Sequence, residues 1–188
     1  MEFENCKFKK EKWSGRDLKH AHFSHVTFEH CDLSQSNLTS SRFFECVFVE
    51  CDLSLIKIEG CRLQDIEFKR CKLTGVNFTL SDKTFLSLKF KECLIDTCNF
   101  SDLDLKNISF AESRIRDTYF TGANLTGASF IGCDLNRSIF HNTILNKADF
   151  QDAINYSISP LANKLSKAKF SQPEVLNLLR HLDIIISE

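Results

Sequence analysis

Nine cysteines and six histidines are the side chains in this sequence best suited to binding a metal ion or exchanging electrons. Zinc sites and redox pairs usually place two cysteines at short, fixed spacings such as Cys-x-x-Cys. No Cys-x-x-Cys occurs here, and the closest cysteines stand five residues apart. The spacing favours cysteine as a small apolar side chain in a narrow interior over a metal or redox site.

The histidines and carboxylates offer no better chemical site. His20, His22, His25 and His30 lie close together along the chain, but we expect them on the solvated surface and not around a metal ion. No glycine-rich phosphate loop, nucleophilic serine motif or pair of carboxylates at a catalytic spacing stands out. We therefore predict no catalytic residue, no metal ligand and no cofactor, and we expect a chain that is not an enzyme.

The chain is organised by a period of five residues. Large apolar residues occupy every fifth position in two long runs, and a helix or a strand would instead repeat every 3.6 or 2.0 residues. Such a chain must turn once per unit and return the same side chain to one interior. The expected apolar centres are Phe3, Phe8, Trp13, Leu18, Phe23, Phe28, Leu33, Leu38, Phe43, Phe48, Leu53, Ile58, Leu63, Phe68, Leu73, Phe78, Phe85, Phe90, Ile95, Phe100, Leu105, Phe110, Ile115, Phe120, Leu125, Phe130, Leu135, Phe140, Leu145 and Phe150.

One interruption separates the two runs. The next step after Phe78 falls on Lys83, and the period resumes after a shift of two residues. We therefore expect thirty units over residues 1–152, with Ser81 and Asp82 inserted as an outward bulge near 79–84. All nine cysteines stand two residues before a centre, which places them in the interior: Cys6, Cys31, Cys46, Cys51, Cys61, Cys71, Cys93, Cys98 and Cys133.

The clearest units are Ala-Asn-Leu-Thr-Gly at 123–127, Ala-Ser-Phe-Ile-Gly at 128–132 and Cys-Asp-Leu-Asn-Arg at 133–137. They resemble the pentapeptide-repeat family, whose consensus unit is Ala-Asp/Asn-Leu-x-x. The resemblance implies an all-β fold, a right-handed quadrilateral parallel β-helix with four units per coil. A column of phenylalanines at intervals of one four-unit coil agrees with that number: Phe8, Phe28, Phe48, Phe68, Phe90, Phe110, Phe130 and Phe150.

Residues 153–188 lack the period and are expected to form a C-terminal cap. Ser171 and Glu174 match a capping box and predict a short α-helix. Its apolar stripe and the β-prone residues after it would cover the last coil. The resemblance to Qnr and microcin-immunity proteins implies, in addition, that two chains form a homodimer through this segment. The expected dimerisation residues are Val175, Leu178, Leu179, Leu182, Ile184, Ile185 and Ile186.

Charge and hydropathy limit the partners. Among 188 residues, 24 Lys and Arg balance 25 Asp and Glu, which argues against a strongly basic nucleic-acid binder. No run of 18 apolar residues predicts a membrane-spanning helix, and the first residues show no apolar secretory signal. We expect a cytoplasmic protein with reduced cysteines that contacts neither membrane nor nucleic acid directly.

The resemblance to the Qnr, MfpA and microcin-immunity branch implies a DNA-mimicking partner of DNA gyrase or topoisomerase IV that protects the enzyme from its poisons. Outward carboxylates would then stand in for phosphates. The candidate binding residues form the acidic band Glu29, Asp32, Glu45, Glu50, Asp52 and Glu59. The alternative is a protein-interaction scaffold with another partner, for which Val47, Val49 and Leu55 are candidate contacts.

Overall fold

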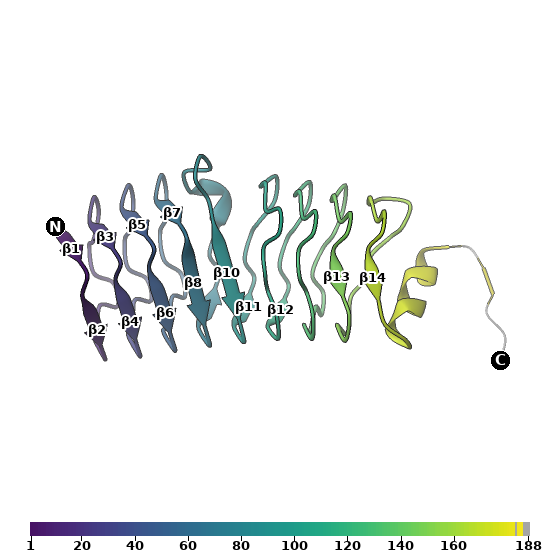
Figure 1. Ribbon diagram of the computed structural model, residues 1–188, viewed down its shortest axis with the longest axis horizontal. Helices are drawn as coiled ribbons and strands as arrows, with labels where there is room; N and C mark the ends of the chain where they lie inside the picture. Colours follow the sequence, from purple (N-terminus) through teal and green to yellow (C-terminus); the bar gives the residue numbers. More distant parts are fainter. Residues whose placement is uncertain (183, 186–188) are drawn as a thin grey trace.

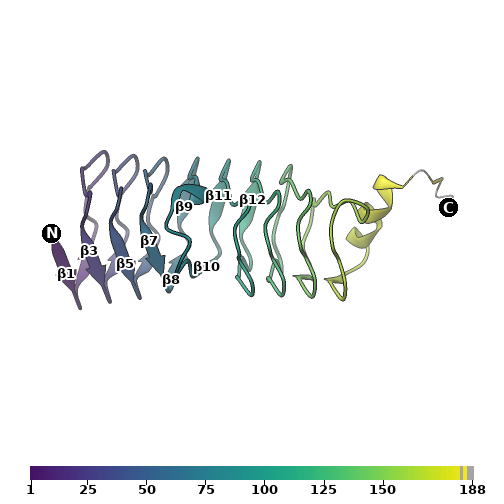
Figure 2. The same ribbon diagram turned by 90° about the horizontal axis from the view of Figure 1, so that it is seen from above.

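The computed structural model describes residues 1–182 and 184–185 as a parallel β-solenoid of about eight turns. Its coils follow one another in a row, so the first coil and the last helix lie at opposite ends of a rod (Figures 1 and 2). The strands are β1 (Glu2–Glu4), β2 (Lys7–Lys9), β3 (His22–Ser24), β4 (Thr27–Glu29), β5 (Arg42–Phe44), β6 (Val47–Val49), β7 (Arg62–Gln64), β8 (Ile66–Lys69), β9 (Lys72–Thr74), β10 (Leu88–Lys91), β11 (Leu94–Asp96), β12 (Arg114–Arg116), β13 (Asp149–Phe150) and β14 (Lys169–Phe170). Two 3-10 helices, η1 (Phe78–Leu80) and η2 (Glu174–His181), complete the described elements.

The register of the strands confirms four units per coil. Phe8 pairs with Phe28, and Phe28 with Phe48, so each residue meets the residue twenty positions later. The pairing gives a five-stranded sheet ordered β10-β8-β6-β4-β2, a four-stranded sheet ordered β1-β3-β5-β7 and a three-stranded sheet ordered β12-β11-β9. The right-handed quadrilateral β-helix implied by the resemblance is therefore the fold.

Stacked phenylalanine rings fill the centre of the rod. In the column that starts at Phe8 and ends at Phe170, successive ring centroids lie between 4.6 and 5.4 Å apart. A second column runs through Phe78, Phe100, Phe120 and Phe140 with spacings between 4.5 and 5.4 Å. Offset stacking adds to the apolar burial of each ring, so every coil is stabilised by the coils above and below it.

The position two residues before each centre has a polar role that the sequence analysis missed. The Cys93 thiol donates to the carbonyl oxygen of Phe68 at 3.3 Å, and Cys133 donates to Phe110 at 3.0 Å. Ser138 makes the same bond with its hydroxyl, to the carbonyl oxygen of Ile115 at 3.0 Å. Small side chains with a donor can therefore satisfy carbonyl groups of the preceding coil, which favours cysteine, serine and threonine at this position. Ser36 and Cys61 are exceptions, since neither makes this bond.

The interruption lies a few residues later than expected. Asp82 pairs with Arg62, which keeps Asp82 in register, whereas Leu88 pairs with Ile66 after an offset of 22. The two extra residues are accommodated between Asp82 and Leu88, and the loop there extends past the neighbouring turns (Figure 1). Assigning the insertion to Ser81 and Asp82 was wrong, because Ser81 is buried and donates to the Phe78 carbonyl oxygen at 2.7 Å.

Phe85 is not an apolar centre, which corrects a second expectation. Its side chain is 49% exposed, and the Arg62 guanidinium lies 5.0 Å from the centre of its ring. Leu86 packs against the core instead. Counting five residues back from Phe90 selects Phe85, but the interrupted unit carries two extra residues and does not keep that phase.

The coil continues beyond residue 152, where the five-residue spacing stops. Tyr156 and Ile158 are buried, and β14 pairs with β13, so that Phe170 stacks on Phe150. The cap as a separate segment therefore begins near residue 171 in the structure, and not at 153.

The predicted α-helix and its capping box are wrong. The helix η2 is a 3-10 helix that starts after Pro173, and no side chain caps it. The Ser171 hydroxyl instead accepts a hydrogen bond from the Asp152 amide at 2.7 Å, which ties it to the preceding coil. The Glu174 carboxylate accepts from the Asn177 side chain at 2.6 Å and does not reach back toward Ser171.

Candidate interaction surface

The cysteines are interior side chains. Cys6 is half-buried and the other eight are buried. Burial raises the pKa of Cys61, Cys98 and Cys133 to about 12. Because the thiolate is the reactive form, these three thiols stay protonated and inert at neutral pH.

Three histidines, His22, His25 and His30, each lie against a different carboxylate. His25 Nδ1 lies 3.2 Å from the Glu45 carboxylate, and His30 Nδ1 lies 3.0 Å from Glu50. Within residues 1–182 and 184–185, no group of three or more His, Cys, Asp or Glu side chains is placed to hold a metal ion. In the same part of the chain, no helix is long and apolar enough to cross a membrane.

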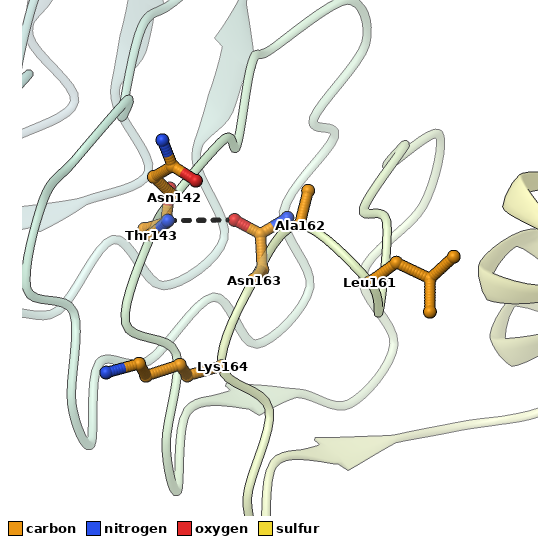
Figure 3. A pocket seen from close by; sticks show the side chains of 6 residues that line it. All are labelled: Asn142, Thr143, Leu161, Ala162, Asn163 and Lys164. Carbon is orange, nitrogen blue, oxygen red and sulfur yellow. Dashed lines mark hydrogen bonds between the residues drawn. The ribbon is translucent and has the colours of Figure 1, made fainter.

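The hollows on the rod are shallow and carry little chemistry. Figure 3 shows one of about 280 Å³ beside the last coils, lined by Asn142, Thr143, Leu161, Ala162, Asn163 and Lys164. The Asn163 side chain accepts from the Thr143 amide at 2.9 Å and donates to the carbonyl oxygens of Phe140 and Ser159. This amide thus joins two parts of the coil, and Lys164 is the one ionisable group among the lining residues.

The structure does not bring the six residues of the acidic band together on one side. Glu29 belongs to β4 in the five-stranded sheet, whereas Asp32 and Asp52 lie in a separate ladder of bridges. Glu45 and Glu50 occupy two different corners of the coil, each with a left-handed φ near 50°. Glu59 lies further along the same coil, where it accepts from the Thr39 hydroxyl at 3.3 Å. The band therefore wraps around the rod.

Four of these six carboxylates also have a basic partner. Glu29 pairs with Lys7, whose hydrogen bond lowers the pKa of that carboxyl. The Glu50 carboxylate lies 2.9 Å from Arg70, and Asp52 lies 3.2 Å from Lys72. His25 lies beside Glu45, and Lys7, Arg70 and Lys72 place positive charge next to the other three carboxylates. The field outside the band is weaker than its carboxylates alone would produce.

The expected dimerisation residues lie at the free end of the rod. Val175, Leu178, Leu179 and Leu182 are half-buried, and Leu178 packs against the core. Ile184 and Ile185 are 53% and 98% exposed, and Ile186 lies outside the described residues.

The candidate contacts of a scaffold lie elsewhere on the rod. Val47 and Val49 are half-buried in β6, and Leu55 is 53% exposed at a corner.

Two protein-family models together match most of the chain. The family model described as "Pentapeptide repeat region" matches residues 21–100, and the one described as "Pentapeptide repeats (8 copies)" matches 98–137 and 118–154. No curated protein matches by sequence.

Solved structures match over the whole rod. One structure of trypsin-treated QnrB1, a plasmid-mediated fluoroquinolone resistance protein, has a TM-score of 0.75 at 16% identity and covers 100% of this chain and 97% of that chain. A second trypsin-treated QnrB1 structure has a TM-score of 0.65 at 18% identity, covering 100% and 99% of the two chains. At these identities the likeness shows a shared fold.

Proposed function

The chain belongs to the pentapeptide-repeat family, and from that premise we propose that it acts by binding another protein along its rod and catalyses no reaction. The main support for this proposal is the shape of the rod. A continuous stacked core holds its coils in a row, and its long, regular outer sides face solvent. Repeat rods of this kind use extended surfaces for contact, because their rigidity lowers the entropy cost of association.

The partner we propose is a type II topoisomerase, DNA gyrase or topoisomerase IV. Support comes from the resemblance to the Qnr branch and from the likeness to QnrB1, a fluoroquinolone resistance protein, over 100% of this chain and 97% of that one. In this form of the proposal, the acidic band competes with DNA for a basic groove of the enzyme. Binding would then weaken as salt rises, since salt screens such contacts.

The pairing of charges favours a second candidate, a scaffold with a different partner. A DNA mimic needs a continuous negative surface, and here Glu50 lies between His30 and Arg70 along the rod. A scaffold requires no such surface. The two candidates share the fold and the absence of catalysis, and they differ in whether topoisomerase activity responds to the protein.

A titration of gyrase distinguishes the two candidates. DNA supercoiling and cleavage-complex yield would be measured with and without a fluoroquinolone while the purified protein is added. The topoisomerase proposal expects fewer cleavage complexes and restored supercoiling in the presence of the drug. If the protein neither binds gyrase at low salt nor changes cleavage-complex yield, the topoisomerase proposal is contradicted and the scaffold proposal is favoured.

A matched pair of variants tests the acidic band. Glu45→Lys, Glu50→Lys and Asp52→Lys together should weaken gyrase binding about tenfold, which corresponds to about 1.4 kcal/mol. The control reverses the same number of charges at Asp102, Asp104 and Glu112, which are exposed and lie outside the band. Two residues of each triplet occupy left-handed corners, so backbone effects are equal. Equal losses in both variants would assign the effect to net charge.

We further propose a homodimer formed through η2 and the residues after it. The exposed apolar side chains Leu176, Ile184 and Ile185 lie at the end of the rod, and η2 contains no fully buried residue. Apolar side chains left exposed in this way favour association, because pairing removes them from water.

A further inference from the structure

One side of the rod has the opposite charge to that expected of a DNA mimic. It is the outer surface of the five-stranded sheet of β2, β4, β6, β8 and β10, which Figure 1 shows as a row along the first half of the rod. Its basic side chains, which we call the lysine face, are Lys7, Lys9, Lys69, Lys89 and Lys91. The same strands carry two outward carboxylates, so this surface has a net positive charge.

The two carboxylates lie beneath the ammonium groups. Glu29 lies between Lys7 and Lys9, and Glu67 lies 2.7 Å from Lys69 and 3.1 Å from Lys89. Both glutamate side chains are 23% exposed, whereas Lys9 and Lys89 are 60% and 59% exposed. The lysines are therefore more exposed than the two glutamates on these strands, and each glutamate holds two lysines in place. At the edge, Lys91 also lies 3.5 Å from Glu92, just beyond β10.

An apolar pair divides the lysine face into two clusters. Val47 and Val49 are the outward residues of β6, the middle strand of the sheet, and both are half-buried. In register, Val47 is two strands from Lys7 and two strands from Lys89. With strands about 4.8 Å apart, each lysine pair at an edge lies about 10 Å from the valines.

We propose that the lysine face docks an acidic protein segment with an apolar residue at its centre and carboxylates about 10 Å to either side. Charge complementarity selects an acidic segment, and Val47 and Val49 select an apolar side chain between its carboxylates. The inference goes beyond the proposed topoisomerase partner, because it concerns a basic surface and not the acidic band. It requires only that the rod binds protein.

Nucleic acid fits this surface less well. The outward side chains of the five strands include no arginine for bidentate phosphate contacts and no aromatic ring for stacking on bases. The two glutamates contact the lysines and weaken the binding of any anion, so the central valines distinguish the two kinds of partner. An acidic peptide can place an apolar side chain on Val47 and Val49, whereas a nucleic acid backbone has no apolar group for them.

A fluorescent peptide tests the proposal on the full chain. The probe has two glutamates, a glycine, two leucines, a glycine and two glutamates, which in extended form places each glutamate pair about 10 Å from the leucines. Binding would be followed by fluorescence anisotropy at low salt. A labelled single-stranded DNA of about 20 nucleotides is the competing probe.

The first variant removes charge from the two edge strands by Lys7→Gln, Lys9→Gln, Lys89→Gln and Lys91→Gln. Its control carries Lys19→Gln, Lys57→Gln, Lys106→Gln and Lys147→Gln, four exposed lysines outside this sheet with the same loss of charge. We expect about a tenfold loss of peptide affinity in the first variant and less than about twofold in the control. Equal losses, or no binding by the unaltered protein, would overturn the proposal.

A second variant keeps every charge and tests the apolar centre. Val47→Thr with Val49→Thr preserves the β-branched shape and should weaken binding of the leucine probe about threefold. It should leave unchanged the weaker binding of a probe with glycine in place of leucine. If DNA binds more tightly than the peptide and loses affinity in the lysine variant, the surface binds nucleic acid and the peptide proposal fails. Thermal unfolding of each variant verifies that the rod remains folded.

Discussion

Along the rod, centres such as Phe28, Phe90 and Phe130 are completely buried, whereas η2 at its end contains no fully buried residue. The contrast follows from the number of neighbours. A ring such as Phe110 lies between Phe90 and Phe130, with centroids 5.1 and 5.2 Å away, whereas η2 follows the last coil at the end of the rod (Figure 1). Stability should therefore reside in the rod, and the end should contribute mainly to association.

The largest effect is expected from removing a ring in the middle of a column. Phe68 is 3% exposed and stacks on Phe48 and Phe90 at 5.1 and 5.0 Å. Phe68→Ala should lower the free energy of unfolding by about 3–5 kcal/mol, because it leaves a cavity between two coils. Chemical denaturation would measure the loss, with Lys69→Ala on the surface as control. Equal shifts in both variants would contradict the assignment of Phe68 to the core.

The buried thiols should make the rod sensitive to alkali. Burial raises the pKa of Cys61, Cys98 and Cys133 to about 12, from 9.0. The thiols of the unfolded chain lose their protons at a lower pH than those of the folded chain. Their contribution to the free energy of unfolding is therefore fully present below pH 9 and is lost as pH rises toward 12. At pH 10, each such thiol should lower the free energy of unfolding by about 1 kcal/mol relative to its value below pH 9.

Denaturation midpoints at pH 8 and pH 10 measure this loss. Cys98→Ala should reduce the difference between the two midpoints. A midpoint that does not change with pH would mean that the thiols ionise freely in the folded rod. A thiol titration gives an independent reading: near zero reactive groups in the native protein and nine after unfolding.

A smaller effect is expected at the interruption of the rod. Phe85→Ala should cost less than about 1 kcal/mol, because the half-exposed ring makes mainly the cation–π contact with Arg62. The same substitution would cost as much as Phe68→Ala if Phe85 were an apolar centre. The denaturation midpoint of this variant therefore shows whether Phe85 is an apolar centre or lies in the loop.

The smallest effect on unfolding is expected from ending the chain at Ser171. That residue keeps its hydrogen bond from Asp152, and Phe170 still stacks on Phe150. We expect the denaturation midpoint to move far less than in Phe68→Ala. Light scattering should show the dimer of the full chain become a monomer. A full chain that is already monomeric would contradict the proposed dimer.

The five-residue period by itself determined the phase of the interior and the main phenylalanine column, and the resemblance of its units to the pentapeptide-repeat consensus implied the fold class. These follow from a local rule, since each unit repeats the same turn and returns the same side chain inward. The pattern of cysteines also followed from that phase, and burial of eight of the nine agrees with it. The polar role of these thiols as donors to the preceding coil required a partner that the period does not identify.

Only the tertiary structure decided which residues leave the coil and which charges face each other. Asp82 stays in register because it pairs with Arg62, twenty positions earlier, and Phe85 is displaced into the loop. Phe170 joins the rod by stacking on Phe150, although the local spacing has stopped. The pairing of Glu50 with Arg70, and the gathering of Lys7 and Lys89 on one sheet, likewise depend on contacts between coils, about twenty or more residues apart in the chain.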